Sequence, residues 1–234
     1  MKIALLGYGR MGKTIEKFAQ ERNHEIVFIL DKNEEKGSLA EAEVAINFSV
    51  PEAAVKNIKL ALGKKIPVIC GTTGWLDFYD EVTSFCNTNK TAFLYASNFS
   101  IGVNLFFKIN ELAAKLMKPH SEEYKPSIQE IHHIHKLDAP SGTAITIAEY
   151  LVDTGHFSTW ELNGTTDKKL NIESVREGEV PGTHSITYHS QVDEISLKHE
   201  AFSRDGFALG AVIAAEWILN KKGVFSMQDV LNIS

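Results

Sequence analysis

Residues 132–144, "HHIHKLDAPSGTA", place three histidines and a lysine within five positions and follow them with small residues. These residue types suit a metal site, a proton-donating site, or a polar strand end without a function. In an extended strand, His133 and His135 would share one face. His132 and Lys136 would share the other face, and a cation beside a titratable ring favours proton transfer.

A helix is predicted directly after these histidines. Ser141 is a favourable N-cap residue, so Gly142 and Thr143 would form the first helical turn. The free N–H groups and the dipole of such a helix end attract anions. A lysine, a histidine and a helix N-terminus so close together predict a site that binds a small carboxylate substrate and protonates it.

The metal interpretation needs ligands from elsewhere in the chain, because two histidines two residues apart cannot complete a zinc site. The two cysteines, Cys70 and Cys86, lie far from this segment and form no CxxC pair. We therefore expect no metal ion. A polar strand end without a function stays the remaining alternative to catalysis.

A second chemical motif is "GYGRMG", a GxGxxG loop formed by Gly7, Gly9 and Gly12 between an apolar run and a helical pattern. Such glycines make a tight turn, let the backbone approach a pyrophosphate, and let the helix pack close to the sheet. Asp31 follows the third glycine by 19 residues, where a carboxylate meets the ribose 2′-hydroxyl of a dinucleotide. Lys32 could instead meet a 2′-phosphate, so both NAD and NADP stay open.

Two further turns end predicted strands in small residues. In "CGTTGW", Gly71, Thr72 and Thr73 could line the nicotinamide side of a cofactor. The segment "ASNFSIGVN" at 96–104 ends the next predicted strand and could line a cofactor in the same way. The alternative is that both segments are ordinary strand-to-helix turns.

Composition excludes several classes of protein. The chain has 234 residues, of which 44% are hydrophobic, so it can form one or two domains. A net charge of −6 without a basic run argues against binding to nucleic acid or to a membrane surface. No apolar run approaches the roughly 20 residues of a membrane span, and the N-terminal run is too short for a signal peptide. We expect a soluble cytoplasmic protein.

Strand and helix patterns alternate over the first hundred residues. Short apolar runs predict strands at 2–7, 25–30, 44–49, 66–71 and 91–97. Strands that are apolar on both faces indicate a parallel sheet with helices on both sides. Residues 32–43 leave room for at most one turn of helix between the second and third strands.

The pattern changes after residue 98. Helices are predicted at 101–117 and 141–154, and strands of alternating polarity at 127–136, 170–177, 184–190 and 194–202. Alternation suits an antiparallel or mixed sheet with one packed face. The predicted fold class is therefore α/β: a Rossmann-like domain at 1–98, completed by C-terminal helices at 207–234, and an inserted α+β domain at 99–206.

The segment "EIHHIHKLDAPSGTA" resembles the signature of the dihydrodipicolinate reductase family, also called 4-hydroxy-tetrahydrodipicolinate reductase, of bacterial lysine and diaminopimelate biosynthesis. The resemblance extends to "GYGRMG", "INFSVPEA", "CGTTGW", "SNFSIGVN", "GTHSI" and "HEAFSRDGFALGAVIAAEW", and so covers nearly the whole chain.

This resemblance implies that NADH or NADPH reduces 4-hydroxy-tetrahydrodipicolinate, a dicarboxylate, and that the inserted domain binds the substrate and assembles a homotetramer. It implies that His132 is the catalytic histidine and Lys136 the proton donor. The implied substrate contacts are His133, Ser141, Gly142 and Thr143. The expected cofactor contacts are Gly7, Gly9, Arg10, Met11, Gly12, Asp31, Lys32, Gly71, Thr72, Thr73, Ser97, Asn98 and Phe99.

One segment departs from the family pattern, because residues 32–43 are fewer than the family usually has there. The shorter connection weakens any inference about cofactor preference. Two alternatives share the glycine loop: another two-domain amino-acid dehydrogenase, and an NAD-binding sensor without catalysis. Neither explains why His132 and Lys136 are both present before a helix N-terminus.

Overall fold

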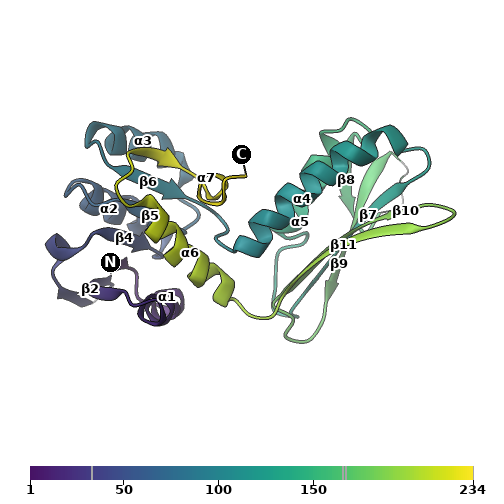
Figure 1. The fold of residues 1–234 in the computed structure, drawn as a ribbon. Helices are drawn as coiled ribbons and strands as arrows, with labels where there is room; N and C mark the ends of the chain where they lie inside the picture. The colour runs from purple at the N-terminus through teal and green to yellow at the C-terminus, as the bar shows by residue number, and fades with distance from the viewer. Residues whose placement is uncertain (33, 165, 167, 234) are drawn as a thin grey trace. The chain divides into compact units, whose positions relative to one another are not determined.

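The computed structural model describes residues 1–32, 34–164, 166 and 168–233. The chain forms two compact units, one of Met1–Asn104 with Asp205–Ser234 and one of Leu105–Arg204 (Figure 1). The division runs through α4 (Ile101–Met117). No helix in the described part of the chain is long and apolar enough to cross a membrane.

The first unit contains a seven-stranded sheet in the order β12-β6-β5-β4-β1-β2-β3. All neighbouring strands except β2 and β3 pair in parallel, which confirms the predicted Rossmann-like sheet. The edge strand β12 lies within 207–234, where only helices were predicted, because a three-residue strand that depends on pairing with β6 has too short an apolar run to be recognised. The order reverses at β1, and ligands of such sheets bind at the carboxyl ends of the strands beside the reversal. The parallel strands are β1 (Lys2–Leu6), β2 (Glu25–Asp31), β4 (Val44–Asn47), β5 (Val68–Cys70), β6 (Ala92–Tyr95) and β12 (Gly223–Phe225).

Helices cover this sheet on both faces, as the apolar strands predicted. In β1, Ile3 and Leu5 join a core with α1 and α6, whereas Ala4 and Leu6 join a core with α2 and α3. The helix α6 also packs on β4, β5 and β6 (Figure 1). The helices of this unit, besides the start of α4, are α1 (Arg10–Glu21), α2 (Pro51–Leu62), α3 (Tyr79–Thr88), α6 (Asp205–Ile218) and α7 (Met227–Leu231), with 3-10 turns at Leu39–Glu41 and Leu76–Phe78.

The short connection after β2 contains an edge strand that the sequence analysis did not predict. The strand β3 (Glu34–Gly37) pairs antiparallel with β2 and places Glu34 opposite Asp31. Gly37 has φ +80°, and a Cβ there would meet the carbonyl oxygen of Val27 at 2.0 Å. A tight hairpin needs fewer residues than a crossover helix, and the single 3-10 turn then leads into β4.

The second unit contains a five-stranded mixed sheet in the order β11-β10-β7-β9-β8. The strand β10 is antiparallel to β7 and β11, while β9 is parallel to β7 and β8. The helix α5 (Gly142–Val152) and residues of α4 pack on one face of the sheet. Its strands are β7 (Lys125–His132), β8 (Thr159–Leu162), β9 (Lys169–Arg176), β10 (Gly182–His189) and β11 (Glu194–Ala201), and a 3-10 turn lies at Lys118–His120.

The predicted strand at 127–136 is four residues too long at its carboxyl end. The strand β7 ends at His132, and the N–H of Lys136 then donates to the carbonyl of His133 at 3.1 Å. The prediction that His132 and Lys136 share a strand face is therefore wrong. The chain leaves the sheet because the N–H groups of His133 and Ile134 bond to the carbonyls of Val180 and Gly178 instead.

Candidate active site

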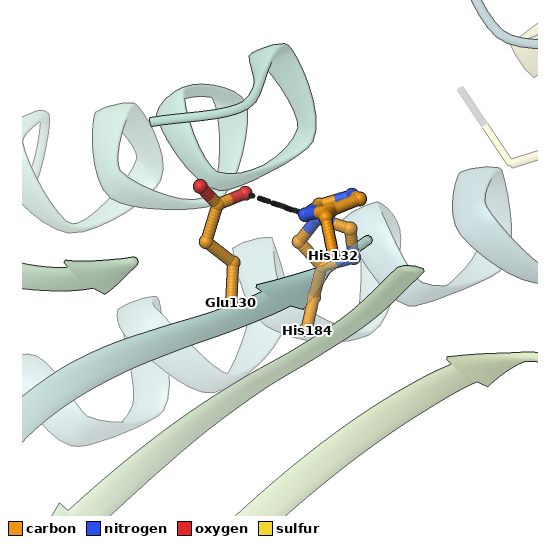
Figure 2. Close-up of side chains that lie close together, drawn as sticks. All are labelled: Glu130, His132 and His184. Carbon is orange, nitrogen blue, oxygen red and sulfur yellow. Dashed lines mark ion pairs between the residues drawn. The ribbon is translucent and has the colours of Figure 1, made fainter. Parts of the chain in front are cut away.

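Strand register brings five polar side chains together on the helix-covered face of the second sheet. Glu130 on β7 lies opposite Ser174 on β9 and opposite His184 on β10. His132 follows two residues later on the same face and lies opposite Arg176. Figure 2 shows Glu130, His132 and His184 turned toward one another.

The Glu130 carboxylate is the centre of this cluster and is fully buried. It accepts hydrogen bonds from the backbone N–H of Ser141 at 3.1 Å, from the Ser174 hydroxyl at 2.6 Å and from the Arg176 guanidinium at 3.1 Å. Burial raises the pKa of Glu130, but the adjacent His132 ring and these three hydrogen-bond donors outweigh burial and hold that pKa well below its usual range. The side chain is therefore a carboxylate at neutral pH.

The ring of His132 is buried and enclosed on several sides. Its Nδ1 atom lies 3.2 Å from Glu130 Oε2, which is an ion-pair distance, although the contact is not a well-aligned hydrogen bond (Figure 2). A Cβ on Gly182 would come within 3.1 Å of His132 Nε2, so the glycine leaves room for the ring. The His184 ring packs edge-on at 5.0 Å between centroids.

His184 is buried beside the N-terminus of α5. Its Nε2 atom lies 3.0 Å from the Ser141 hydroxyl, which also accepts the N-cap hydrogen bond from Ala144 N–H at 3.2 Å. Burial, together with the positive charge of a protonated His132, lowers the pKa of His184 to about 3. His184 is therefore neutral, and its Nε2 shares a hydrogen bond with the Ser141 hydroxyl whose direction depends on the ring tautomer.

Lys136 lies in the loop between β7 and α5, and its side chain is 20% exposed. Its ammonium is 2.7 Å from both carboxylate oxygens of Asp138, and this contact lowers the pKa of Asp138. Lys136 also helps to lower the pKa of His184, which places its charge near the buried cluster.

The other two histidines of the segment have separate environments. His133 Nε2 lies 3.1 Å from the guanidinium of Arg204. Partial burial and the Arg204 charge lower the pKa of His133. His135 is exposed, and its Nε2 lies 3.2 Å from Glu179. Only one of the three histidines therefore belongs to the buried cluster.

The first turn of α5 is open to a ligand. Ser141 is the N-cap, as predicted. A Cβ on Gly142 would meet nothing within 4 Å. Thr143 is half-buried.

Glu130, His132 and His184 could also hold a metal ion by spacing, because one ligand atom from each lies within 4.8 Å of the others. The chemistry of the donor set opposes this. The carboxylate already accepts three hydrogen bonds, one of them from the cationic Arg176, whose charge would repel a metal. The expectation of no metal stays a prediction.

The glycine loop in the first unit fits a dinucleotide pyrophosphate. Gly7 has φ +101°, and a Cβ there would meet Phe48 O at 2.2 Å; a Cβ on Gly12 would meet Gly7 O at 2.4 Å. A Cβ on Gly9 would meet nothing within 4 Å, so packing does not explain this glycine and its backbone is open to a ligand. The helix α1 begins at Arg10 without a side-chain cap or an acidic residue in its first turn, which suits an anion.

Asp31 and Lys32 are exposed at the carboxyl end of β2. The edge strand β3 adds a second carboxylate there, because Glu34 pairs with Asp31 across the hairpin. The sequence analysis missed Glu34, since nothing in the short connection predicted an antiparallel strand.

The other expected cofactor contacts divide into exposed and structural residues. Thr73 and Ser97 are exposed, and Asn98 is half-buried. The buried Thr72 hydroxyl accepts hydrogen bonds from Ser49 N–H at 2.9 Å and Asn47 Nδ2 at 3.2 Å, so it ties two strand ends together.

Two more of these residues pack on the ring of Phe48. A Cβ on Gly71 would overlap that ring at 2.2 Å. Phe99 is buried, and its ring centroid lies 5.6 Å from that of Phe48. The Phe99 carbonyl in turn packs against Gly210, where a Cβ would meet it at 1.8 Å, so Phe99 is a core residue of the first unit.

Sequence reasoning missed Glu130, His184, Ser174, Arg176 and Arg204. Three signals were present. Glu130 precedes His132 by two residues, which puts both on one strand face. His184 lies inside the motif "GTHSI", and Arg204 lies inside the motif "HEAFSRDGFALGAVIAAEW". Ser174 and Arg176 carried no such signal, because only tertiary pairing brings them to the site.

Comparison with known proteins matches both halves of the chain to one family. Residues 1–99 match the model described as dihydrodipicolinate reductase, N-terminus, and residues 102–231 match that described as dihydrodipicolinate reductase, C-terminus. The 4-hydroxy-tetrahydrodipicolinate reductase of Christiangramia forsetii is 50% identical over 99% of this chain and 98% of its own. That of Archaeoglobus fulgidus is 34% identical over 99% of this chain and 100% of its own.

Solved structures share the fold. The dipicolinate-bound dihydrodipicolinate reductase from Paenisporosarcina sp. TG-14 has a TM-score of 0.81 at 23% identity and covers 97% of each chain. A probable dehydrogenase from Thermotoga maritima has a TM-score of 0.63 at 11% identity and covers 100% of this chain and 93% of its own. The fold alone therefore does not identify the substrate, but the family matches do discriminate between enzymes. This chain belongs to the dihydrodipicolinate reductase family.

Proposed function

We propose that this protein reduces 4-hydroxy-tetrahydrodipicolinate to tetrahydrodipicolinate with NADH or NADPH, in lysine and diaminopimelate biosynthesis. The observation that carries the proposal is the buried Glu130–His132 pair beside the open N-terminus of α5. An acid–base group next to an anion-binding helix end is what reduction and protonation of a dicarboxylate need. The family membership supports the same reaction.

The substrate half of the site lies in the second unit. The N–H groups at Gly142 and Thr143 and the Thr143 hydroxyl bind a substrate carboxylate, and Ser141 fixes the helix end by capping it. His133 contacts the substrate, and its neighbour Arg204 adds positive charge there. Lys136 supplies the proton, with Asp138 holding its ammonium in the loop.

The cofactor half lies in the first unit. The backbone around Gly9 and the N-terminus of α1, with Arg10 and Met11, would hold the pyrophosphate, and Asp31 would bind the ribose. The nicotinamide ring, when bound, supplies a hydride. The loops that carry Thr73 and Ser97 end neighbouring parallel strands and would line the nicotinamide side.

The same proposal includes the domain roles, the assembly and the location. Residues 1–98 with 207–234 bind the dinucleotide, and residues 99–206 bind the substrate and form a homotetramer in the cytoplasm. An apolar stripe on α4, defined as Leu105, Ile109, Leu112 and Leu116, supports self-association, because all four side chains are at least 40% exposed.

A coupled assay tests the reaction. Aspartate semialdehyde and pyruvate, with the synthase that condenses them, generate the unstable substrate, and oxidation of NADH or NADPH is followed by absorbance. We expect oxidation that depends on both the synthase and this protein. Absence of oxidation with either cofactor, from a folded protein, would contradict the proposal.

A further inference from the structure

We propose that Glu130 is a positioning residue for His132: its buried carboxylate orients the His132 ring and ties it to the helix end that binds the substrate. This inference rests on the proposed function, since it assigns a role within that site. Glu130 does not touch the substrate in this assignment and acts only through the histidine.

The first support is that Glu130 itself is held rigidly. Its side chain is completely buried and has three donors from two segments: the N–H of Ser141 at the N-cap of α5, and the Ser174 hydroxyl and Arg176 guanidinium of β9. Arg176 in turn donates to the carbonyl of Asp138 at 2.7 Å, in the loop that carries Lys136. One carboxylate therefore connects the sheet, the loop and the helix end.

The second support is that His132 is confined on opposite edges of its ring. Nδ1 faces Glu130 at 3.2 Å, and the Nε2 edge faces the space that Gly182 leaves by having no side chain. With Nδ1 turned to the carboxylate, Nε2 is the nitrogen left for the substrate. A carboxylate that orients a catalytic or metal-bound imidazole through its second nitrogen is a recurrent arrangement in enzymes.

The third support is the cost of placing a charge here. The preceding residue on this face of β7, Ile128, is an ordinary core side chain. Burying a carboxylate and a guanidinium instead is no better for stability than well-packed apolar residues. A purely structural role as a cap for α5 would leave the contact with His132 unexplained.

Substitution of Glu130 by Gln tests the orientation directly. Glu130→Gln keeps the shape but removes the charge, and we expect kcat to fall about 10- to 100-fold, the scale for groups that orient a reacting side chain. The KM for substrate and the affinity for NADH should change less than about threefold, well below that loss. Glu130→Asp keeps the charge and should restore part of kcat.

A matched control uses the opposite face of the same sheet. Glu173 is an exposed carboxylate on β9 that accepts a hydrogen bond from Gln129 at 2.7 Å. Glu173→Gln makes the same chemical change outside the cluster, so kcat should stay at the wild-type value. Circular dichroism and thermal melting report whether each variant folds.

Two measurements keep the proposal testable if Glu130→Gln folds poorly. Gly182→Ala pushes the His132 ring from its other edge and should lower kcat without changing NADH affinity. Ring 15N spectra of the ligand-free protein should show a proton on Nδ1 of His132 in the wild type and in Glu173→Gln, and a smaller Nδ1-protonated fraction in Glu130→Gln.

The outcomes separate this inference from the proposed function. If wild type reduces the substrate but Glu130→Gln keeps its kcat, or its His132 ring spectrum is unchanged, the positioning role is wrong. If the loss in Glu130→Gln lies entirely in KM or in melting temperature, Glu130 is only a structural cap. If wild type has no reductase activity, the proposed function fails, while the ring spectra still test the contact between Glu130 and His132.

Discussion

At the scale of single residues, the site divides charge between a buried cluster and an accessible loop. The cluster keeps Glu130 ionised and His184 neutral. Lys136 is less buried and is paired with Asp138, so it is the cation that can approach a substrate. This division assigns orientation to the cluster and proton delivery to the loop.

The proton-donor assignment predicts the kinetics of Lys136→Ala. The variant should lose kcat by about 10² or more, the usual scale for general acid catalysis. NADH affinity, measured by fluorescence titration, should hardly change. Lys125→Ala, at the exposed start of β7, is the control and should retain activity. A fall in NADH binding as large as the fall in turnover would mean that Lys136 belongs to the cofactor site and is not the proton donor.

The helix-end assignment predicts the behaviour of Thr143→Val. Removing the hydroxyl loses one charge-assisted hydrogen bond, worth roughly 1.5–3 kcal/mol, with little change of shape. We expect a higher substrate KM and, in parallel, weaker competitive inhibition by pyridine-2,6-dicarboxylate in the presence of NADH. Thr146→Val, one turn further along α5, is the control. Equal inhibition of both variants, or inhibition of wild type only with added zinc, would show that the helix end is not the anion site.

The buried cluster also predicts how stability depends on pH. The folded-state pKa of His184, about 3, lies below the ordinary histidine value, so the folded protein binds fewer protons than the unfolded chain below pH 6.5. The lowered pKa of Glu130 acts in the same direction at lower pH. The contribution of these groups to the free energy of unfolding is therefore fully present above pH 6.5 and is lost as the pH falls. The loss is up to roughly 1.4 kcal/mol per pH unit for one such group.

Urea unfolding at several pH values measures this loss. His184→Gln should flatten the decline in unfolding free energy between pH 6.5 and 4, whereas His120→Gln, at an exposed position, should leave the decline as in wild type. An identical slope in wild type and His184→Gln would mean that His184 is not the buried neutral base described here.

At the scale of elements, the β2–β3 hairpin determines the adenosine end of the cofactor site. Asp31 should accept a hydrogen bond from the ribose 2′-hydroxyl and repel a 2′-phosphate, and Glu34 adds a second negative charge beside it. The positive charge of Lys32 opposes both negative charges. The balance between NADH and NADPH binding is therefore set by a strand pairing rather than by the glycine loop.

Cofactor preference tests this balance. We predict use of both NADH and NADPH with less than about tenfold difference in kcat/KM, a gap below about 1.4 kcal/mol. Asp31→Ala and Glu34→Gln should shift the ratio towards NADPH, and Lys32→Ala towards NADH. A wild-type preference above a hundredfold would show that the backbone shape of the hairpin, rather than these charges, selects the cofactor.

At the scale of the whole molecule, the proposed homotetramer needs a surface that covers apolar side chains. Three residues of the α4 stripe, Ile109, Leu112 and Leu116, line an apolar cavity of about 340 Å³ in the second unit together with Ile195. Leu112→Glu combined with Leu116→Glu should place two charges there and convert the assembly to smaller species in light scattering after gel filtration. Leu60→Glu, at a partly exposed position in the first unit, should leave the mass unchanged. An unchanged mass for the double variant would place the subunit interface elsewhere.

The sequence by itself determined the features that depend on neighbouring residues. Apolar runs predicted the parallel strands of the first unit except β12, spacing placed Gly7, Gly9 and Gly12 in a strand–loop–helix turn, and Ser141 predicted the start of α5. Each of these follows from local backbone preference and periodicity. The motifs that resemble the reductase family are local in the same sense, which is why the family could be identified before the fold.

Only the tertiary structure decided which side chains meet. Glu130 faces Ser174 and His184 because β7 pairs with β9 and β10 in one register, and a shift of one residue would turn these side chains to the other face. The end of β7 at His132 depends on carbonyls some 45 residues later in the chain, and β3 depends on pairing with an exposed edge. These pairings join residues that are distant in sequence, so local propensity does not predict them.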